Sequence, residues 1–143
     1  MFAYTNIMRL TITKEDYLRA LYLIEKKRGA PARAVDLARE LHLSRSTVSE
    51  RLQELARQKL VLHGHYGDVA LTSKGRHAAQ NLTRKHRLIE VFLLRTLKVA
   101  AKDVHSEAHE LEHAMSDAVI EKLAKFLGNP KVDPHGAPIP PRA

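Results

Sequence analysis

The sequence predicts a mainly α-helical protein in which a winged helix-turn-helix domain precedes a second, all-helical domain. Apolar residues recur at helical spacing along most of the 143 residues. Two short apolar segments, Leu60–Leu62 and Val69–Leu71, flank a glycine-containing stretch and predict a hairpin after the third helix. Charge also divides the chain: residues 1–98 contain 19 Lys and Arg against 9 Asp and Glu, whereas residues 99–143 contain 5 against 7. A basic first part beside a slightly acidic second part indicates a polyanionic partner for the first.

The first two helices are predicted from their ends as well as from their apolar positions. Thr13-Lys-Glu-Asp16 resembles a capping box, so we expect a helix to begin at Thr13 and to end near Gly29. A second, shorter helix is expected from about Arg33 to Leu41. These two helices would form the support of the helix-turn-helix.

The third helix is expected to begin with Ser44 or Ser46 as its N-cap. Its apolar residues Val48, Leu52 and Leu55 share one side, which leaves polar residues on the opposite side. In a helix-turn-helix this helix enters the major groove, where small hydroxyls and arginines reach bases and phosphates. An ordinary surface helix is the alternative. The candidate DNA-binding residues are Arg45, Ser46, Thr47, Ser49, Glu50 and Arg51.

Three further helices and a tail complete the prediction. A long fourth helix starts at Thr72-Ser-Lys-Gly75 and continues to about Leu97, a fifth runs from about Asp103 to Met115, and Ser116 caps a sixth that ends near Gly128. Five of the six prolines lie in the last residues, which we expect to form an extended linker. The expected division is a DNA-binding domain at 1–72, a helical domain at 73–128 and a Pro-rich tail at 129–143.

Composition excludes several classes of protein. The chain has no cysteine, so it has neither disulfides nor thiolate metal sites. No run of 18 or more apolar residues occurs, and the first residues lack the apolar core of a signal peptide. We therefore expect a soluble cytoplasmic protein with no membrane partner.

Histidines and carboxylates recur at helical spacing in the second part of the chain. In the fifth helix four of them share one face at i, i+4, i+7 and i+8, and in the fourth helix a His and a Glu form an i, i+4 pair. Imidazole nitrogen and carboxylate oxygen without sulfur suit Mn²⁺, Fe²⁺, Co²⁺, Ni²⁺ or Zn²⁺. Solvated helix positions are the alternative for each residue alone. The candidate metal ligands are His86, Glu90, His105, His109, Glu112 and His113.

The segment His109-Glu-Leu-Glu-His113 also matches the H-E-x-x-H signature of zinc proteases. That chemistry needs a third ligand downstream, and only Glu121 and His135 are available there. Neither an extended protease pattern nor a substrate cleft is evident. Glu110 projects about 100° away from His109, whereas Glu112 shares its face. We therefore expect no enzymatic activity and no small-molecule substrate, with a zinc hydrolase kept as an alternative.

Six segments in order resemble the diphtheria toxin repressor and manganese transport regulator family of metal-dependent transcriptional repressors. The resemblance covers nearly the whole chain. It implies a winged-helix DNA-binding domain, a helical dimerisation and metal-binding domain, and Mn²⁺ or Fe²⁺ as corepressor. The segments are Glu15-Asp-Tyr-Leu-Arg-Ala-Leu-Tyr, Ser46-Thr-Val-Ser, Leu71-Thr-Ser-Lys-Gly, His86-Arg-Leu-Ile-Glu-Val-Phe-Leu, Val104-His-Ser-Glu-Ala-His-Glu-Leu-Glu-His-Ala-Met-Ser-Asp and Pro134-His-Gly-Ala-Pro-Ile-Pro.

The resemblance also implies two metal sites and a function. A metal held by both Asp16 in the first helix and the fifth helix would tie the two domains together and set the spacing of the recognition helices in a homodimer on a palindromic operator. The expected function is metal-activated repression of metal-homeostasis genes; a DNA-binding regulator with a purely structural metal is the alternative. One site would use His86, Glu90 and His105, and the other Asp16, His109, Glu112 and His113.

Three departures from the family pattern qualify these expectations. His109 stands where relatives have cysteine or glutamate, and Arg19 stands where the manganese branch has another carboxylate. Asp16 matches the manganese branch rather than the methionine of the iron branch, and a hard carboxylate favours Mn²⁺ over Fe²⁺, with Co²⁺, Ni²⁺ or Zn²⁺ as surrogates. Longer relatives continue after a similar tail into a small β-barrel domain, and in its absence we expect water to complete the His86 site.

Overall fold

A computed structural model describes residues 2–64 and 67–143, and the side chains from Lys14 onward within those ranges. The chain forms two compact units, residues 1–79 and 80–143. The boundary lies inside the long fourth helix, and the second unit includes the tail. Within the described ranges, no helix is long and apolar enough to cross a membrane.

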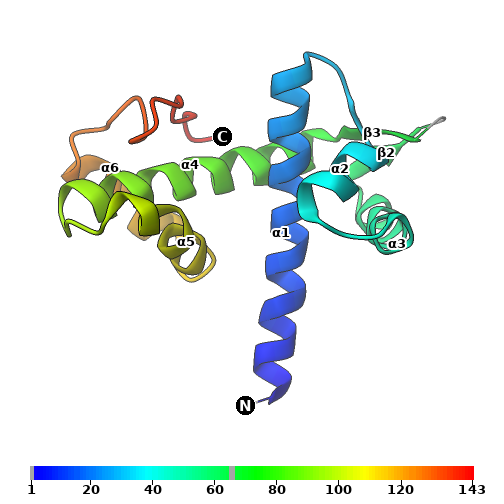
Figure 1. Cartoon of the computed structure of the whole chain (residues 1–143), viewed down its shortest axis with the longest axis horizontal. Coiled ribbons are helices and arrows are strands. Elements are labelled where there is room, and N and C mark those ends of the chain that lie inside the picture. The colour runs from blue at the N-terminus through cyan, green and yellow to red at the C-terminus, as the bar shows by residue number, and fades with distance from the viewer. Residues whose placement is uncertain (1, 65–66) are drawn as a thin grey trace. The chain divides into compact units, whose positions relative to one another are not determined.

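Unit 1 is a winged helix-turn-helix, as expected (Figure 1). The first strand of a small antiparallel sheet lies between the first two helices, the other two strands follow the third helix, and the first turns of a fourth helix come next. The elements are α1 (Phe2–Arg28), β1 (Ala32–Arg33), α2 (Ala34–Leu41), α3 (Arg45–Arg57), β2 (Val61–His63), β3 (Asp68–Leu71) and the start of α4 (Ser73–Arg95).

The turn between α2 and α3 is held by two local features. His42 ends α2 in the left-handed conformation, with φ 55°. The Ser44 hydroxyl accepts a hydrogen bond from the backbone N–H of Thr47 at 3.2 Å, which identifies Ser44 as the N-cap of α3. The apolar side of α3 is fully buried at Val48 and Leu52, so the polar side faces outward.

The wing is a three-stranded sheet with the order β1-β3-β2. Val61 pairs with Leu71 and His63 with Val69, close to the two strands expected from the sequence. The two-residue strand β1 was not predicted, because so short a segment carries no alternation of apolar and polar residues. Residues 65 and 66 of the predicted hairpin lie outside the described residues.

The segment Thr72–Gly75 joins the wing to α4. The Thr72 hydroxyl donates to the Lys59 carbonyl at 2.7 Å and accepts from the Gly75 backbone N–H at 3.1 Å. A Cβ at Gly75 would clash with the Leu60 carbonyl oxygen, so this position requires glycine. The close approach fixes the base of the wing against the first turn of α4.

The expected start of α1 at Thr13 is wrong. α1 begins at Phe2 and continues without interruption to Arg28. Neither glycine nor proline occurs between residues 2 and 28, so nothing in this segment ends the helix before it reaches the predicted capping box.

Unit 2 packs the rest of α4 against α5 (Ala101–Glu112) and α6 (Asp117–Phe126). Its core contains Leu88 and Ile89 from α4, Ala108 from α5 and Ala124 from α6. Ser116 caps α6, as predicted, because its hydroxyl accepts from the Val119 backbone N–H at 3.3 Å. The three helices therefore share one apolar core.

The tail is folded, and the prediction of an extended linker is wrong. It doubles back on itself, because the Asp133 N–H donates to the Ala137 carbonyl and the Ile139 N–H donates to the Lys131 carbonyl. The Asp133 carboxylate accepts two further backbone hydrogen bonds, from His135 and Ala137, each at 2.8 Å. Ile139 is buried in the core of unit 2.

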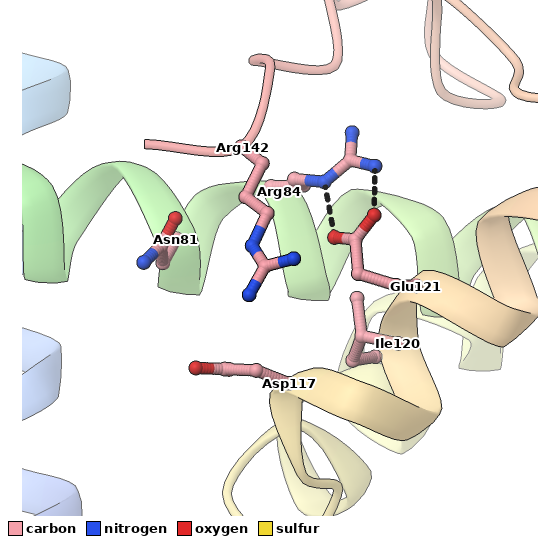
Figure 2. A pocket seen from close by; sticks show the side chains of 6 residues that line it. All are labelled: Asn81, Arg84, Asp117, Ile120, Glu121 and Arg142. Atoms are coloured by element: carbon pink, nitrogen blue, oxygen red, sulfur yellow. Dashed lines mark hydrogen bonds and ion pairs between the residues drawn. The ribbon is translucent and has the colours of Figure 1, made fainter.

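The tail is also bound along α4 by side chains that reach its backbone. Proline has no N–H but keeps its carbonyl, which makes these residues good acceptors for long polar side chains. Figure 2 shows the end of this segment, where Arg142 lies over the pocket formed with α4 and α6. The contacts are Gln80 to Pro141 O, Arg84 to Pro140 O, Arg87 to Pro138 O and the Ala143 N–H to the Asn81 side chain.

Candidate metal centre

Unit 2 brings the predicted imidazoles and carboxylates together in two groups. α4 positions His86 and Glu90 one turn apart. α5 presents His105, His109 and Glu112, and His113 caps the C-terminus of that helix. We call the first group the His86 cluster: His86, Glu90 and His105. We call the second group the His113 cluster: His109, Glu112 and His113.

The His86 cluster is compact. Nε2 of His86 lies 3.3 Å from Oε1 of Glu90 and 3.1 Å from Nδ1 of His105. His86 and Glu90 are buried, whereas His105 is exposed at the rim. One ligand atom from each residue lies within 4.8 Å of the others. These three residues therefore lie together, as the family resemblance implies, and their role as metal ligands stays a prediction.

The tail adds two residues that the sequence reasoning did not assign to this site. Nδ1 of His135 lies 3.7 Å from Oε2 of Glu90, and Glu90, Asp133 and His135 form a further group with metal-ligand atoms in reach of one another. Asp133 and His135 are therefore candidate ligands beside the water that the sequence analysis expects at this site. The signal available in the sequence was an acid and an imidazole two residues apart, Asp133 and His135, within the proline-rich tail. It was not used because the tail was interpreted as a linker.

The state of Glu90 fits a cation site. Its Oε2 is buried and accepts no hydrogen bond from any described residue, although Nδ1 of His105 and Nδ1 of His135 each lie 3.7 Å away. Neighbouring ligands around a cation bound at about 2.1 Å are separated by roughly 3.0–3.5 Å, close to the spacing here. The donor set of nitrogen and oxygen without sulfur suits Mn²⁺ or Fe²⁺.

Electrostatics keep Glu90 charged. Burial would raise the pKa of Glu90, but the hydrogen bond from His86 and the positive fields of His86, His105 and His135 outweigh burial, so its pKa is lowered. The residue is thus a carboxylate at neutral pH, the form that binds a divalent cation.

The His113 cluster is centred on the fully buried Glu112. Its Oε1 lies 3.2 Å from Nδ1 of His109 and 3.3 Å from Nε2 of His113. The rings of His109 and His113 are nearly perpendicular, with centroids 5.3 Å apart. Glu110, by contrast, is exposed. The geometry gives Glu112, and not the Glu of the H-E-x-x-H signature, the place between the two imidazoles.

Asp16 belongs to unit 1, and its part in the second metal site remains a proposal. Its side chain is 24% exposed on α1, with Oδ1 3.5 Å from a guanidinium nitrogen of Arg19. Arg19 was noted as replacing a carboxylate of the manganese branch. The ion pair puts a positive charge beside Asp16, where that branch has a second negative one.

The candidate DNA-binding residues all lie on α3. Arg45, Ser46, Thr47 and Glu50 are exposed, whereas Ser49 and Arg51 are half-buried. The Ser46 and Thr47 hydroxyls both contact the Ser44 hydroxyl, so they belong to the cap of the helix as well as to its surface.

Arg51 has a partner within unit 1. Its guanidinium donates to Glu54 at 3.3 Å, and Lys14 lies 3.4 Å from the same carboxylate. Loss of solvation raises the pKa of Glu54, but the hydrogen bonds and positive charges of Lys14 and Arg51 together outweigh it and lower the pKa. The carboxylate of Glu54 thus orients the side chains of Arg51 and Lys14.

Comparison with known proteins covers nearly the whole chain. Residues 9–69 match the family described as the iron dependent repressor, N-terminal DNA binding domain, and residues 72–141 match its metal binding and dimerisation domain. The iron-dependent repressor IdeR of Mycobacterium leprae is 39% identical over 131 residues, which make up 92% of this chain and 56% of IdeR.

Two further comparisons agree. The uncharacterized HTH-type transcriptional regulator MJ0568 of Methanocaldococcus jannaschii is 35% identical over 113 residues, covering 79% of this chain and 90% of that protein. The structure of the manganese regulator SloR superposes with a TM-score of 0.78 at 43% identity, covering 90% of this chain and 60% of that one. The chain thus spans a little more than half the length of IdeR and SloR. It belongs to the diphtheria toxin repressor and manganese transport regulator family of metal-dependent transcriptional repressors.

Proposed function

We propose that this chain is a transcriptional repressor of metal-ion homeostasis genes, activated for operator binding by Mn²⁺ or Fe²⁺ and acting in the cytoplasm. The observation that carries the proposal is the pairing of two units in one chain. One is a winged helix with an outward-facing polar α3, and the other holds two sulfur-free clusters of imidazoles and carboxylates.

Each cluster has residues suited to bind one cation. His86, Glu90 and His105 would hold the first, with Asp133 and His135 completing its ligands from the tail. His109, Glu112 and His113 would hold the second, with Asp16 as its ligand from α1. A divalent cation would add strong, multidentate attraction to the hydrogen bonds and ion pairs that already join these carboxylates and imidazoles.

The coupling to DNA would come from Asp16. This residue lies in the first helix of the DNA-binding unit, whereas its three partners lie in the metal-binding unit. If Asp16 binds the same cation as His109, Glu112 and His113, the two units are tied together. In a homodimer, the two α3 helices would then be held at the spacing of successive major grooves of a palindromic operator. The coupling is reciprocal, so operator DNA should also raise metal affinity.

The ligands favour Mn²⁺ over Fe²⁺. Asp16 offers a hard oxygen, and the chain has no cysteine that could supply a thiolate. Arg19 beside Asp16 disfavours a closely spaced second cation at that position, because a guanidinium repels it.

We also infer that the chain has no hydrolase activity. In the zinc proteases the Glu after the first His is the general base. Here that residue is the exposed Glu110, while the buried Glu112 contacts both imidazoles. Glu112 as a ligand leaves the H-E-x-x-H match without its catalytic role.

The experiment is a binding assay on a DNA duplex selected from a random pool with Mn²⁺ present. Affinity is measured anaerobically at one salt concentration with Mn²⁺, Fe²⁺, Co²⁺, Ni²⁺ or Zn²⁺, and with a chelator alone. The proposal predicts at least about a tenfold gain with Mn²⁺ or Fe²⁺. Equal affinity with metal and with chelator would refute it and would favour a regulator with a purely structural metal.

A further inference from the structure

The two metal clusters are joined by one buried hydrogen bond. Nδ1 of His86 lies 2.5 Å from Oε2 of Glu112, although the two residues are 26 positions apart and come from α4 and α5. Glu112 is 0% exposed and His86 6%. We call this pair the His86–Glu112 bridge.

Each member of the bridge turns its other polar atom to a different cluster. Nε2 of His86 lies with Glu90 and His105 in the His86 cluster. Oε1 of Glu112 lies with His109 and His113 in the His113 cluster. The imidazole of His86 and the carboxylate of Glu112 thus connect the two clusters through different atoms.

The chemistry of imidazole links the hydrogen bond at Nδ1 of His86 to what Nε2 can bind. A neutral imidazole carries one N–H, and only its other nitrogen has a lone pair for a cation. If Nε2 of His86 faces a cation, Nδ1 carries the hydrogen and donates it to Glu112. If Oε1 of Glu112 faces a cation, Glu112 is a carboxylate and its Oε2 accepts that same hydrogen. Both sites thus require one and the same arrangement of the bridge.

We propose that the His86–Glu112 bridge couples the two sites, so that each residue is a ligand at one cluster and a positioning residue for the other. Occupancy of either site selects the His86 tautomer and the Glu112 orientation that the other site needs. The coupling is therefore positive: each site raises the Mn²⁺ affinity of the other. This inference rests on the proposed metal-dependent function.

Two amide replacements at His86 separate the bridge from the ligand. His86→Asn puts an amide N–H near the place of Nδ1, where it donates to Glu112, whereas His86→Gln puts its amide near the place of Nε2. Both variants lose the Nε2 ligand. The control His105→Ala weakens the His86 cluster from its exposed rim without altering either atom of the bridge.

The measurement is Mn²⁺ binding to the full chain, with free Mn²⁺ followed by electron paramagnetic resonance. The His113 cluster should bind Mn²⁺ about 10- to 100-fold more weakly in His86→Gln than in His86→Asn, the range for losing a hydrogen-bond partner of a metal ligand. In His105→Ala, which keeps the bridge, its affinity should fall only by the lost coupling, about fivefold. Equal affinities in the two amide variants would overturn the bridge. Absence of Mn²⁺ binding by the parent chain would instead refute the proposed function.

A second variant tests the coupling from the other side and leaves His86 intact. His113→Ala removes a ligand of the His113 cluster but neither atom of the bridge. Positive coupling predicts that Mn²⁺ affinity at the His86 cluster falls about fivefold or more in this variant. Unchanged affinity there would also overturn the proposal, whether or not His86→Gln folds. Circular dichroism of each metal-free variant checks the fold.

Discussion

His135 from the tail lies beside Glu90 of α4, with its Nδ1 3.7 Å from the buried Oε2 of the carboxylate. The tail thus brings an imidazole to a carboxylate oxygen that accepts no hydrogen bond from the described residues. Arg84 and Arg87 hold the tail there through the carbonyls of Pro140 and Pro138. What the sequence presents as a linker therefore belongs to the candidate metal site.

His135→Ala should weaken Mn²⁺ binding at the His86 cluster by about tenfold or more, because the variant removes a ligand that water replaces only poorly. The measurement is isothermal titration with Mn²⁺. The matched control is His77→Ala, an exposed histidine of α4 that belongs to none of the candidate groups among the described residues. A His135 variant with the parent's affinity would remove the tail from the site.

Glu121→Gln should lower stability at neutral pH. Arg84 binds both oxygens of Glu121, at 3.1 and 3.2 Å (Figure 2). This hydrogen bonding is the main reason that the pKa of Glu121 is lowered, with burial opposing it. A pair this exposed contributes about 1 kcal/mol or less.

The pH dependence of stability tests whether Glu121→Gln acts through the lost charge of Glu121. Because the folded pKa of Glu121 lies below its unfolded value, its contribution is complete above the unfolded pKa and is lost as the pH falls through the folded one. Urea midpoints of the parent and Glu121→Gln should differ at pH 7 and converge below about pH 4. A gap that persists at low pH would mean that the glutamine acts through packing instead of charge.

Gly75→Ala should destabilise unit 1 by about 1–3 kcal/mol, since the added methyl group meets the Leu60 carbonyl and the backbone has to shift. Thermal unfolding measures the loss. Ser73→Ala, an exposed change in the same turn of α4, should stay within about 0.5 kcal/mol of the parent. Equal stabilities of the two variants would contradict the close approach of the wing and α4.

Arg51→Ala should weaken DNA binding about equally for different sequences and reduce the slope of log affinity against log salt by about 1, the behaviour of a phosphate contact. Its pairing with Glu54 leaves the guanidinium oriented on the face of α3. Lys102→Ala is the charge-matched control, because it removes one exposed cation from α5 in unit 2. Binding curves that overlay the parent's at several salt concentrations would show that Arg51 does not touch DNA.

Local signals in the sequence were sufficient for much of the fold. Ser44 and Ser116 cap α3 and α6 because a hydroxyl one residue before a helix satisfies a free N–H, and this needs no distant partner. The His and Glu positions of α4 and α5 followed from helical spacing in the same way. Their grouping into two clusters depended on the resemblance, and the six candidate ligands of unit 2 lie close together in those two groups.

Contacts between residues far apart in the chain could not be predicted from the sequence. The His86–Glu112 bridge joins positions 26 residues apart, and no periodicity within one helix predicts which atoms of another it will meet. His135 reaches Glu90 because the tail folds back along α4, where arginines bind its carbonyls and Ile139 is buried in the core. The capping box at Thr13 led to a wrong helix start. α1 already begins at Phe2, and a capping motif inside a helix does not interrupt it.

The central claim is that metal held with Asp16 controls DNA binding, and one measurement tests it most directly. Affinity for the selected operator duplex is compared with Mn²⁺ and with chelator, in the parent chain and in Asp16→Ala. We predict at least about a tenfold stimulation by Mn²⁺ in the parent and none in Asp16→Ala, with the fold of both intact by circular dichroism. Full stimulation of Asp16→Ala by Mn²⁺ would contradict the account.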